Sequence, residues 1–198
     1  MTTMRVITLD NTPATPWRNG GGVTRELLTW PSPLDWRLRI SVADIAADGP
    51  FSAFPGVRRW FTLLSGDGVA LDFADRSLTQ YPGDAPLAFD GTAAPGCRLI
   101  GGPVRDLNLM VLGGAGGMAA VSTGKAWRPP AGAQAGLFAR VAGRWCHGAD
   151  ERPLLAFSLL WFDAAPPGDW RFQPDTPASA TPEPAGWWLH HLPKTISA

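Results

Sequence analysis

The sequence predicts an all-β protein built of β-sandwiches or barrels, and three observations support this fold class. Gly and Pro, with 23 and 20 of the 198 residues, disfavour long helices and favour short strands joined by turns. Hydrophobic residues make up 45% of the chain and charged residues 17%, so a sizeable core can form. Short apolar runs recur along the chain, whereas no longer window has a convincing helical period.

Runs of strand length cover both halves of the chain. The clearest is residues 36–45, where apolar and polar side chains alternate. Residues 60–64 and 69–73 flank the glycine-containing segment 65–68, so we expect a tight β-hairpin there. The predicted strands are residues 4–9, 23–28, 36–45, 60–64, 69–73, 87–89, 98–100, 107–112, 118–122, 137–141, 154–162, 170–172 and 187–192.

The glycine-rich segment 113–117 predicts a boundary between two units. We expect residues 1–113 to form the first unit and residues 114–198 to form the second. Residues 82–84 and 167–169 both read Pro-Gly-Asp and each precedes a short apolar run. This weak repeat arises either by chance or from two similar β-barrels.

The charge balance argues against several classes of partner. The chain has 17 basic and 17 acidic residues, and the basic ones do not cluster. We therefore expect neither nucleic acid nor an anionic membrane surface as the main partner. No stretch approaches the ~20 apolar residues of a membrane span, and no basic segment precedes an apolar run at the N-terminus. We expect a cytoplasmic protein in which Cys97 and Cys146 are free thiols.

The most unusual segment is residues 16–27, in which Trp17 and Asn19 precede three consecutive glycines. Glycine loses more conformational freedom on folding than any other residue, so such a run indicates positive φ or a close approach of the backbone. The glycines lead directly into a predicted strand, so polar side chains lie next to an open loop. The glycine spacing and the lack of a following helix exclude a phosphate-binding loop.

Two predicted strands carry polar residues on one face. Arg37, Arg39 and Ser41 alternate with apolar residues in one strand, and Asp106 and Asn108 alternate with leucines in another. Each pattern is compatible with a solvated outer face and with a polar pocket. The pattern alone does not choose between them.

Adjacent charged residues in strands face opposite sides of a sheet, as we expect for Arg25 with Glu26 and for Arg58 with Arg59. Taken singly, each favours a surface salt bridge worth ~0–1 kcal/mol. The sequence has no Gly-x-Ser-x-Gly nucleophile elbow and no Walker loop. The adjacent histidines 190–191 point opposite ways in a strand, so we expect no metal site there.

Several motifs in a fixed order resemble the HutD/Ves family of bacterial bicupins. The ordered series is specific, whereas a single motif would not be, and it covers much of the first two-thirds of the chain. The motifs are Trp-Arg-Asn-Gly-Gly-Gly-Val-Thr-Arg-Glu at 17–26, Arg-Ile-Ser-Val-Ala at 39–43, Asp-Gly-Pro-Phe-Ser-Ala-Phe-Pro-Gly at 48–56, Arg at 59 with Thr-Leu-Leu-Ser-Gly at 62–66, and Asp-Leu-Asn-Leu-Met at 106–110.

This resemblance implies a bicupin, that is, two tandem cupin-like barrels in one chain. Residues 1–113 would form an N-terminal barrel with a ligand pocket, and residues 114–198 a degenerate C-terminal barrel. Cupin enzymes generally bind a metal through a His-x-His pair, a carboxylate and a further His. No histidine precedes His147, so we expect neither metal nor cofactor. The family motif favours Arg39 over Arg37 as the functional arginine.

The resemblance also implies association with histidine utilisation, as an accessory or regulatory protein. The leading hypothesis is that the N-terminal barrel binds a small acidic metabolite, such as N-formylglutamate or urocanate. Arginines would bind its carboxylate, amides and a hydroxyl would read its polar groups, and aromatic residues would form an apolar wall. The candidate ligand-binding residues are Trp17, Asn19, Arg25, Glu26, Arg39, Ser41, Phe51, Phe54, Arg59, Asp106 and Asn108.

Two alternatives stay open. The protein could be a metal-independent enzyme, an isomerase or hydrolase with Glu26 or Asp106 as the general base. It could also be a protein-interaction module. The sequence does not decide between catalysis and sensing, and it leaves a homodimer open.

Overall fold

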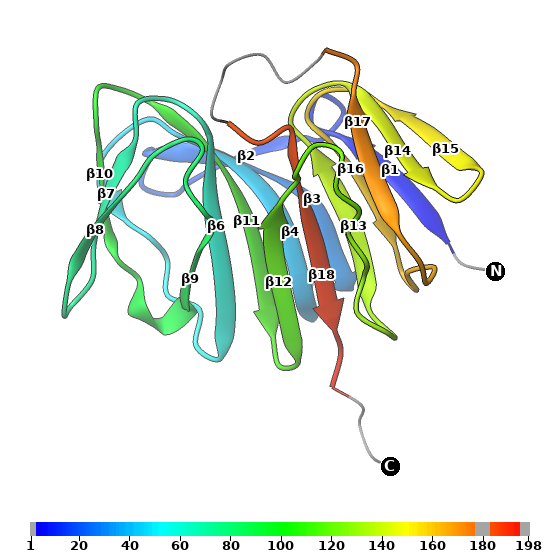
Figure 1. Ribbon diagram of the computed structural model, residues 1–198. Coiled ribbons are helices and arrows are strands. Elements are labelled where there is room, and N and C mark those ends of the chain that lie inside the picture. Colours follow the sequence, from blue (N-terminus) through cyan, green and yellow to red (C-terminus); the bar gives the residue numbers. More distant parts are fainter. Residues whose placement is uncertain (1–2, 177–182, 195–198) are drawn as a thin grey trace. The chain divides into compact units, whose positions relative to one another are not determined.

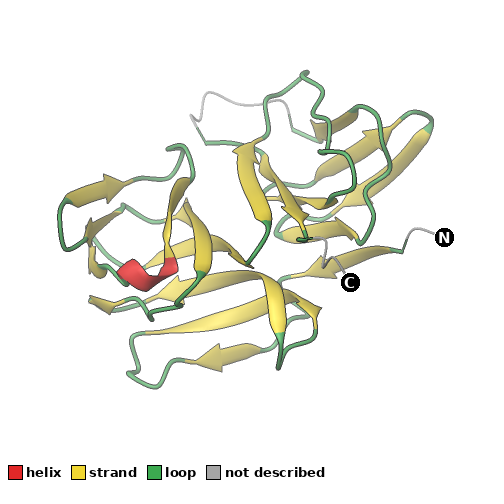
Figure 2. Cartoon of the chain, turned by 90° about the horizontal axis from the view of Figure 1, so that it is seen from below, coloured by secondary structure: helices red, strands yellow, loops and turns green. Residues whose placement is uncertain are grey.

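The computed structural model describes residues 3–176 and 183–194 of the chain. Figure 2 shows strands and loops, with one short 3-10 helix, η1 (Gly91–Ala93), among the described residues. Every strand pairing in this part of the chain is antiparallel, so the predicted all-β fold class is confirmed. No helix within the described ranges is long and apolar enough to cross a membrane.

The chain divides into two units, which are described separately. The N-terminal unit is residues 12–113, and the C-terminal unit combines residues 1–11 with residues 114–198. The expectation that residues 1–11 belong to the first unit is wrong. Strand β1 (Met4–Thr8) pairs with β16 (Ser158–Phe162) and forms an edge of a sheet in the C-terminal unit.

The N-terminal unit contains two antiparallel sheets (Figure 1). The larger has the order β2 (Ala14–Pro16), β3 (Gly22–Pro31), β4 (Trp36–Ile45), β11 (Val104–Leu112), β6 (Val57–Ser65), β9 (Leu87–Asp90). The smaller has the order β5 (Gly49–Pro50), β10 (Gly96–Leu99), β7 (Val69–Asp72), β8 (Ser77–Gln80). Phe61 and Val104 of the larger sheet share one buried cluster with Leu71 and Cys97 of the smaller, so the two sheets pack face to face.

The expected hairpin of residues 60–64 and 69–73 does not form. Strand β6 pairs with β11 and β9, whereas β7 pairs with β10 and β8 in the other sheet. The segment between them does turn sharply at Gly66 and Gly68, which have φ of 102° and 121°. The turn therefore carries the chain from one sheet to the other instead of joining two paired strands.

The glycine run at residues 20–22 has two separate structural causes. Gly20 has a φ of 72°, a left-handed conformation that favours glycine. Gly22 begins β3, where an added Cβ would collide with the backbone carbonyl oxygen of Asp44 and lie 3.3 Å from the ring of Trp17. The backbone at Gly22 must therefore approach β4 closely, as the sequence predicts for such a run.

The C-terminal unit also contains two antiparallel sheets. The five-stranded sheet has the order β1, β16, β13 (Gln134–Ala139), β18 (Gly186–Leu192), β12 (Ala115–Ala120), and the three-stranded sheet has the order β15 (Asp150–Leu154), β14 (Gly143–His147), β17 (Trp170–Pro174). Buried aromatic side chains from both sheets, including Trp145, Trp170 and Trp188, form the core. The predicted strand 154–162 is two strands, because the chain turns at Phe157, whose φ is 54°.

We expect Gly22→Ala to destabilise the protein by roughly 1–3 kcal/mol, because the new methyl group must displace the backbone of β4. The measurement is the free energy of unfolding in urea. Gly96→Ala in β10 is the matched control, since its Cβ would meet nothing closer than 3.7 Å. Equal stabilities of the two variants would contradict the close approach at Gly22.

Candidate functional site

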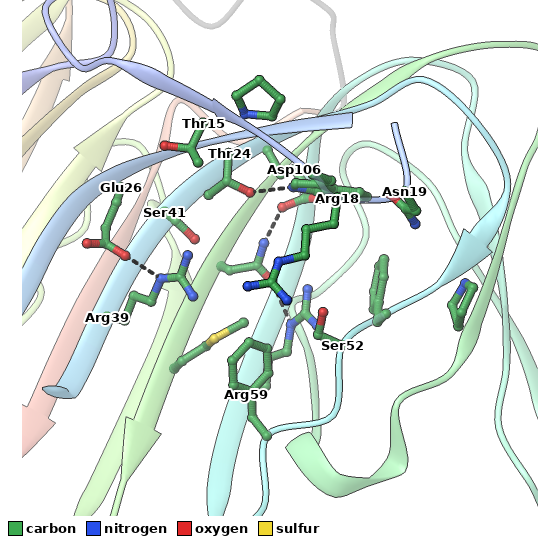
Figure 3. Close-up of a pocket in the computed structure, with 18 residues that line it drawn as sticks. Thr15, Arg18, Asn19, Thr24, Glu26, Arg39, Ser41, Ser52, Arg59 and Asp106 are labelled. Atoms are coloured by element: carbon green, nitrogen blue, oxygen red, sulfur yellow. Dashed lines mark hydrogen bonds and ion pairs between the residues drawn. The ribbon is translucent and has the colours of Figure 1, made fainter. Parts of the chain in front are cut away.

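A cavity of about 690 Å³ lies within the N-terminal unit, and polar side chains of the larger sheet point into it (Figure 3). Strands β3, β4, β11 and β6 supply its floor, and the loops around residues 17–19 and 50–54 supply its walls. The lining residues are Thr15, Pro16, Trp17, Arg18, Asn19, Thr24, Glu26, Arg39, Ser41, Ala43, Pro50, Phe51, Ser52, Phe54, Arg59, Asp106, Asn108 and Met110.

Strand register brings the polar residues of the floor together. Glu26 of β3 is paired with Ser41 of β4, which is paired in turn with Asn108 of β11. Met110 of β11 lies between Arg39 of β4 and Arg59 of β6 in the neighbouring row. Arg39 and Ser41 of β4 therefore face the cavity together with Asp106 and Asn108 of β11.

A β-bulge adjusts the β3 side of the floor. The register between β3 and β4 shifts between Glu26 and Leu28, so that Leu27 is the additional residue. Leu27 and Leu28 are both buried, whereas Glu26 lines the cavity. Bulges of this kind re-aim side chains next to functional sites.

Arg59 is the most deeply buried arginine of the cavity, with a relative exposure of 6%. Its Nε donates to Oδ1 of Asn108 at 2.7 Å, and its guanidinium lies 4.3 Å from the ring centroid of Phe51. Burial lowers the pKa of Arg59 to about 10, Asp106 raises it, and the nearby positive charge of Arg39 lowers it further. Arg59 remains protonated at neutral pH, in surroundings that only partly neutralise it.

Asp106 is buried beside this arginine, with a relative exposure of 1%. Burial raises its pKa to about 7, and Asp44 contributes in the same direction. Three interactions lower the pKa: the positive charge of Arg59, and the hydrogen bonds that the carboxylate accepts from the side-chain amide of Asn108 and from the backbone N–H of Ala43. Asp106 therefore exchanges a proton near neutral pH, where an ordinary aspartate is fully ionised.

Arg39 forms the second charged group of the cavity. Its Nε lies 2.8 Å from Oε2 of Glu26, and both side chains are partly exposed. Arg37 is exposed and does not line the cavity. Of the two arginines that the sequence left open, only Arg39 faces the cavity.

The structure brings ten of the eleven candidate residues to this one cavity. Arg25 is the exception, since it lies next to Glu26 in β3 and faces the other side of the strand. There Arg25 forms an ion pair with Asp44 at 2.6 Å, and Arg105 binds the other oxygen of the same carboxylate. The expected ligand-binding role of Arg25 has no support from its position.

Arg18 is not among the residues predicted for the site, yet its side chain points into the cavity (Figure 3). Two further lining residues were not predicted: Thr24, which accepts a 2.7 Å hydrogen bond from the indole nitrogen of Trp17, and Met110 on the floor. Both Arg18 and Thr24 lie inside the motif at residues 17–26, which is the signal that could have identified them.

The cavity does not fit the metal of cupin enzymes. Its lining includes no histidine, and its two carboxylates already contact Arg39 and Asn108. No group of three or more histidine, cysteine, aspartate or glutamate side chains within residues 3–176 and 183–194 could hold a metal ion. The polar groups that line the cavity are arginines, carboxylates, amides and hydroxyls.

The fold and the cavity together define a cupin-type protein with an arginine-rich pocket in its N-terminal unit. A family model described as HutD matches residues 10–179. The chain belongs to the HutD family, which is associated with the histidine utilisation region.

Two curated relatives support this membership. An uncharacterised 21.2 kDa protein in the hutC 3′ region of Pseudomonas putida is 40% identical over 115 residues, covering 56% of this chain and 59% of the relative. Protein Ves of Citrobacter koseri is 39% identical over 100 residues, covering 50% and 52%. The chain thus matches between half and three-fifths of the length of these relatives.

Solved structures extend the similarity over nearly the whole chain. A conserved protein of unknown function from Pseudomonas aeruginosa PAO1 is 26% identical, with a TM-score of 0.81 over 96% of this chain and 99% of that one. HutD from Pseudomonas fluorescens SBW25 is 25% identical, with a TM-score of 0.79 over 96% and 98%. Oxalate decarboxylase from Bacillus subtilis shares the fold alone, at 10% identity and a TM-score of 0.59.

We expect Asp106→Asn to flatten the pH dependence of stability between about pH 4 and pH 7. The folded state holds a proton on Asp106 up to a pKa of about 7, whereas the unfolded chain releases it near the ordinary value of 3.8. The free energy of unfolding therefore falls as pH rises through this window, by up to roughly 1.4 kcal/mol per pH unit, and levels off above it.

The measurement is urea unfolding of wild type and variant at several pH values across the window. Asp35→Asn, at an exposed position, is the control and keeps the wild-type slope. Identical slopes for wild type and Asp106→Asn would show that Asp106 does not retain its proton on folding.

Proposed function

We propose that the cavity of the N-terminal unit binds a small acidic metabolite without a metal, and that the protein is an accessory or regulatory component of histidine utilisation. The observation that carries this proposal is the convergence of Arg18, Arg39 and Arg59 on one cavity. With Glu26 ionised, the lining carries a net charge of about +2 when Asp106 is protonated and about +1 when it is ionised.

The way the two floor arginines are held favours a carboxylate. Among the described residues, Arg59 donates a hydrogen bond from Nε to Asn108, and Nε of Arg39 forms an ion pair with Glu26. Their terminal nitrogens stay available, and two such nitrogens match the two oxygens of a carboxylate. Each arginine is thus oriented by the protein before an anion arrives, which reduces the entropy cost of binding.

The remaining lining suits a small molecule with a short carbon skeleton. Trp17, Phe51 and Phe54 provide apolar wall, and the buried hydroxyl of Ser41 provides a polar contact on the floor. The hutC-region location of a relative supports intermediates of histidine degradation as candidates. N-formylglutamate and urocanate are therefore the first ligands to test. We also propose that the protein is cytoplasmic.

Isothermal titration calorimetry with N-formylglutamate and urocanate tests the proposal. We expect wild type to bind at least one of them, and Arg39→Gln and Arg59→Gln each to weaken binding about 10- to 100-fold. This is the loss expected for one charge-assisted hydrogen-bonded contact.

Arg37→Gln and Arg58→Gln are the matched controls. Each removes an exposed arginine one or two residues away on the same strand, and both should bind like wild type. Thermal unfolding of every variant separates lost binding from lost folding. The proposal fails if folded wild type binds no histidine-pathway intermediate at millimolar concentration, or if the control variants lose as much affinity as the cavity variants.

Asp106 favours a second candidate function, a metal-independent isomerase or hydrolase. A carboxyl group with a pKa of about 7 in a cavity is suited to act as a general base or acid at neutral pH. The adjacent Arg59 would stabilise negative charge that develops on a substrate.

NMR of a candidate substrate incubated with the protein distinguishes this second function from binding alone. If the protein is an enzyme, we expect turnover that Asp106→Asn lowers about 100-fold or more, with substrate affinity much less affected. Glu26→Gln is the comparison, because it changes the other carboxylate of the cavity. An unchanged substrate spectrum after prolonged incubation with wild type that binds the compound leaves binding as the function.

A further inference from the structure

Arg18 differs from the other two arginines of the cavity. It lies on the exposed loop between β2 and β3, whereas Arg39 and Arg59 project from the sheet. Its side chain nevertheless reaches into the cavity toward Arg59 (Figure 3). The structure shows no hydrogen bond or ion pair of Arg18 with any residue of the described ranges 3–176 and 183–194.

The loop that carries Arg18 is held firmly on both sides of it. The Trp17 backbone N–H donates to the Gly22 carbonyl at 2.9 Å, and the Trp17 indole donates to Thr24. On the other side, the side-chain oxygen of Asn19 accepts from the Gly21 N–H at 3.0 Å. The backbone of Arg18 is therefore fixed over the cavity, while its long side chain keeps rotational freedom.

Repulsion between the positive charges of Arg18 and Arg59 favours movement of the Arg18 side chain away from Arg59. Arg59 is buried and held through Nε by Asn108, so it cannot retreat from another positive charge. Arg18 is exposed and can swing away into water. An anion seated on Arg59 reverses the sign of the force, because its negative charge attracts the second guanidinium.

We propose that Arg18 closes the site by folding onto a carboxylate already bound to Arg59, and that it thereby slows release of the ligand. This inference rests on the proposed function, since it needs an anionic ligand in the cavity. It also defines the ligand further, because the carboxylate must present oxygen atoms to the loop side as well as to the floor. Arg18 is then a residue that determines residence time.

A closing contact and long-range attraction have different kinetic signatures. Long-range attraction by an exposed charge raises the association rate and is screened by salt. A contact formed after binding lowers the dissociation rate. Its effect persists at high salt, because salt screens a partly buried pair of guanidinium and carboxylate much less than an exposed one. Rate constants at two salt concentrations therefore distinguish the two roles.

The experiment uses N-formylglutamate as the probe and follows exchange of the Trp17 indole N–H resonance by NMR at about 0.05 and 0.5 M NaCl. We expect Arg18→Gln to raise the dissociation rate about 10-fold or more at both salt concentrations, with the association rate at high salt changed less than about threefold. Arg18→Lys keeps the charge but loses the two-pronged donor, so we expect an intermediate dissociation rate. Arg37→Gln is the matched exposed control and retains wild-type rates.

Three outcomes overturn the inference. Unchanged rates for Arg18→Gln, in protein whose wild type binds the probe, would reject Arg18 alone and leave the proposed function standing. A slower association with unchanged dissociation, lost at high salt, would show long-range attraction in place of closure. No binding of the probe to folded wild type at millimolar concentration would reject the inference together with the proposal that this probe is a ligand.

Discussion

The buried positive charge of Arg59 is the main electrostatic constraint on the cavity of the N-terminal unit. A guanidinium out of water is costly unless hydrogen bonds and opposite charge compensate it. Asn108 supplies the hydrogen bond and Phe51 supplies an aromatic face, but Asp106 supplies only part of a negative charge, since its own pKa rises to about 7 on burial. The sheet therefore fixes a positive charge in a cavity without fully neutralising it, which is a favourable arrangement for an anionic ligand.

Local periodicity predicted the strand of residues 36–45 with the bounds that β4 has, because a sheet buried on one face requires alternation. The pairing of strands that are distant in the sequence cannot be predicted from local periodicity. The glycines at 65–68 correctly indicate a turn, yet nothing local specifies that β6 and β7 join different sheets. The pairing of β1 with β16 likewise joins residues that are 150 or more positions apart in the sequence, so local patterns could not assign residues 1–11 to the C-terminal unit.

The residues of the cavity were likewise only partly predictable from the sequence. Alternation predicted which face Ser41 and Asn108 share, and strand register then made them neighbours, which no sequence period encodes. The choice of a pocket over a solvated face came from family motifs and not from the residues' own pattern. Arg18 was missed because an arginine in an exposed loop normally points into water, and only the anchored loop around Trp17 turns it inward.

The Asp106–Asn108–Arg59 chain connects the fold to ligand charge. If a carboxylate binds the free end of Arg59, it supplies the negative charge that Asp106 supplies only in part. The same carboxylate is a like charge for Asp106, so it favours the protonated form and raises the pKa of that group further. Anion binding near neutral pH is then accompanied by proton uptake, and the affinity falls as pH rises through 7. In the proposed binding reaction, the incompletely compensated charge of Arg59 thus makes the affinity depend on the charge of the ligand.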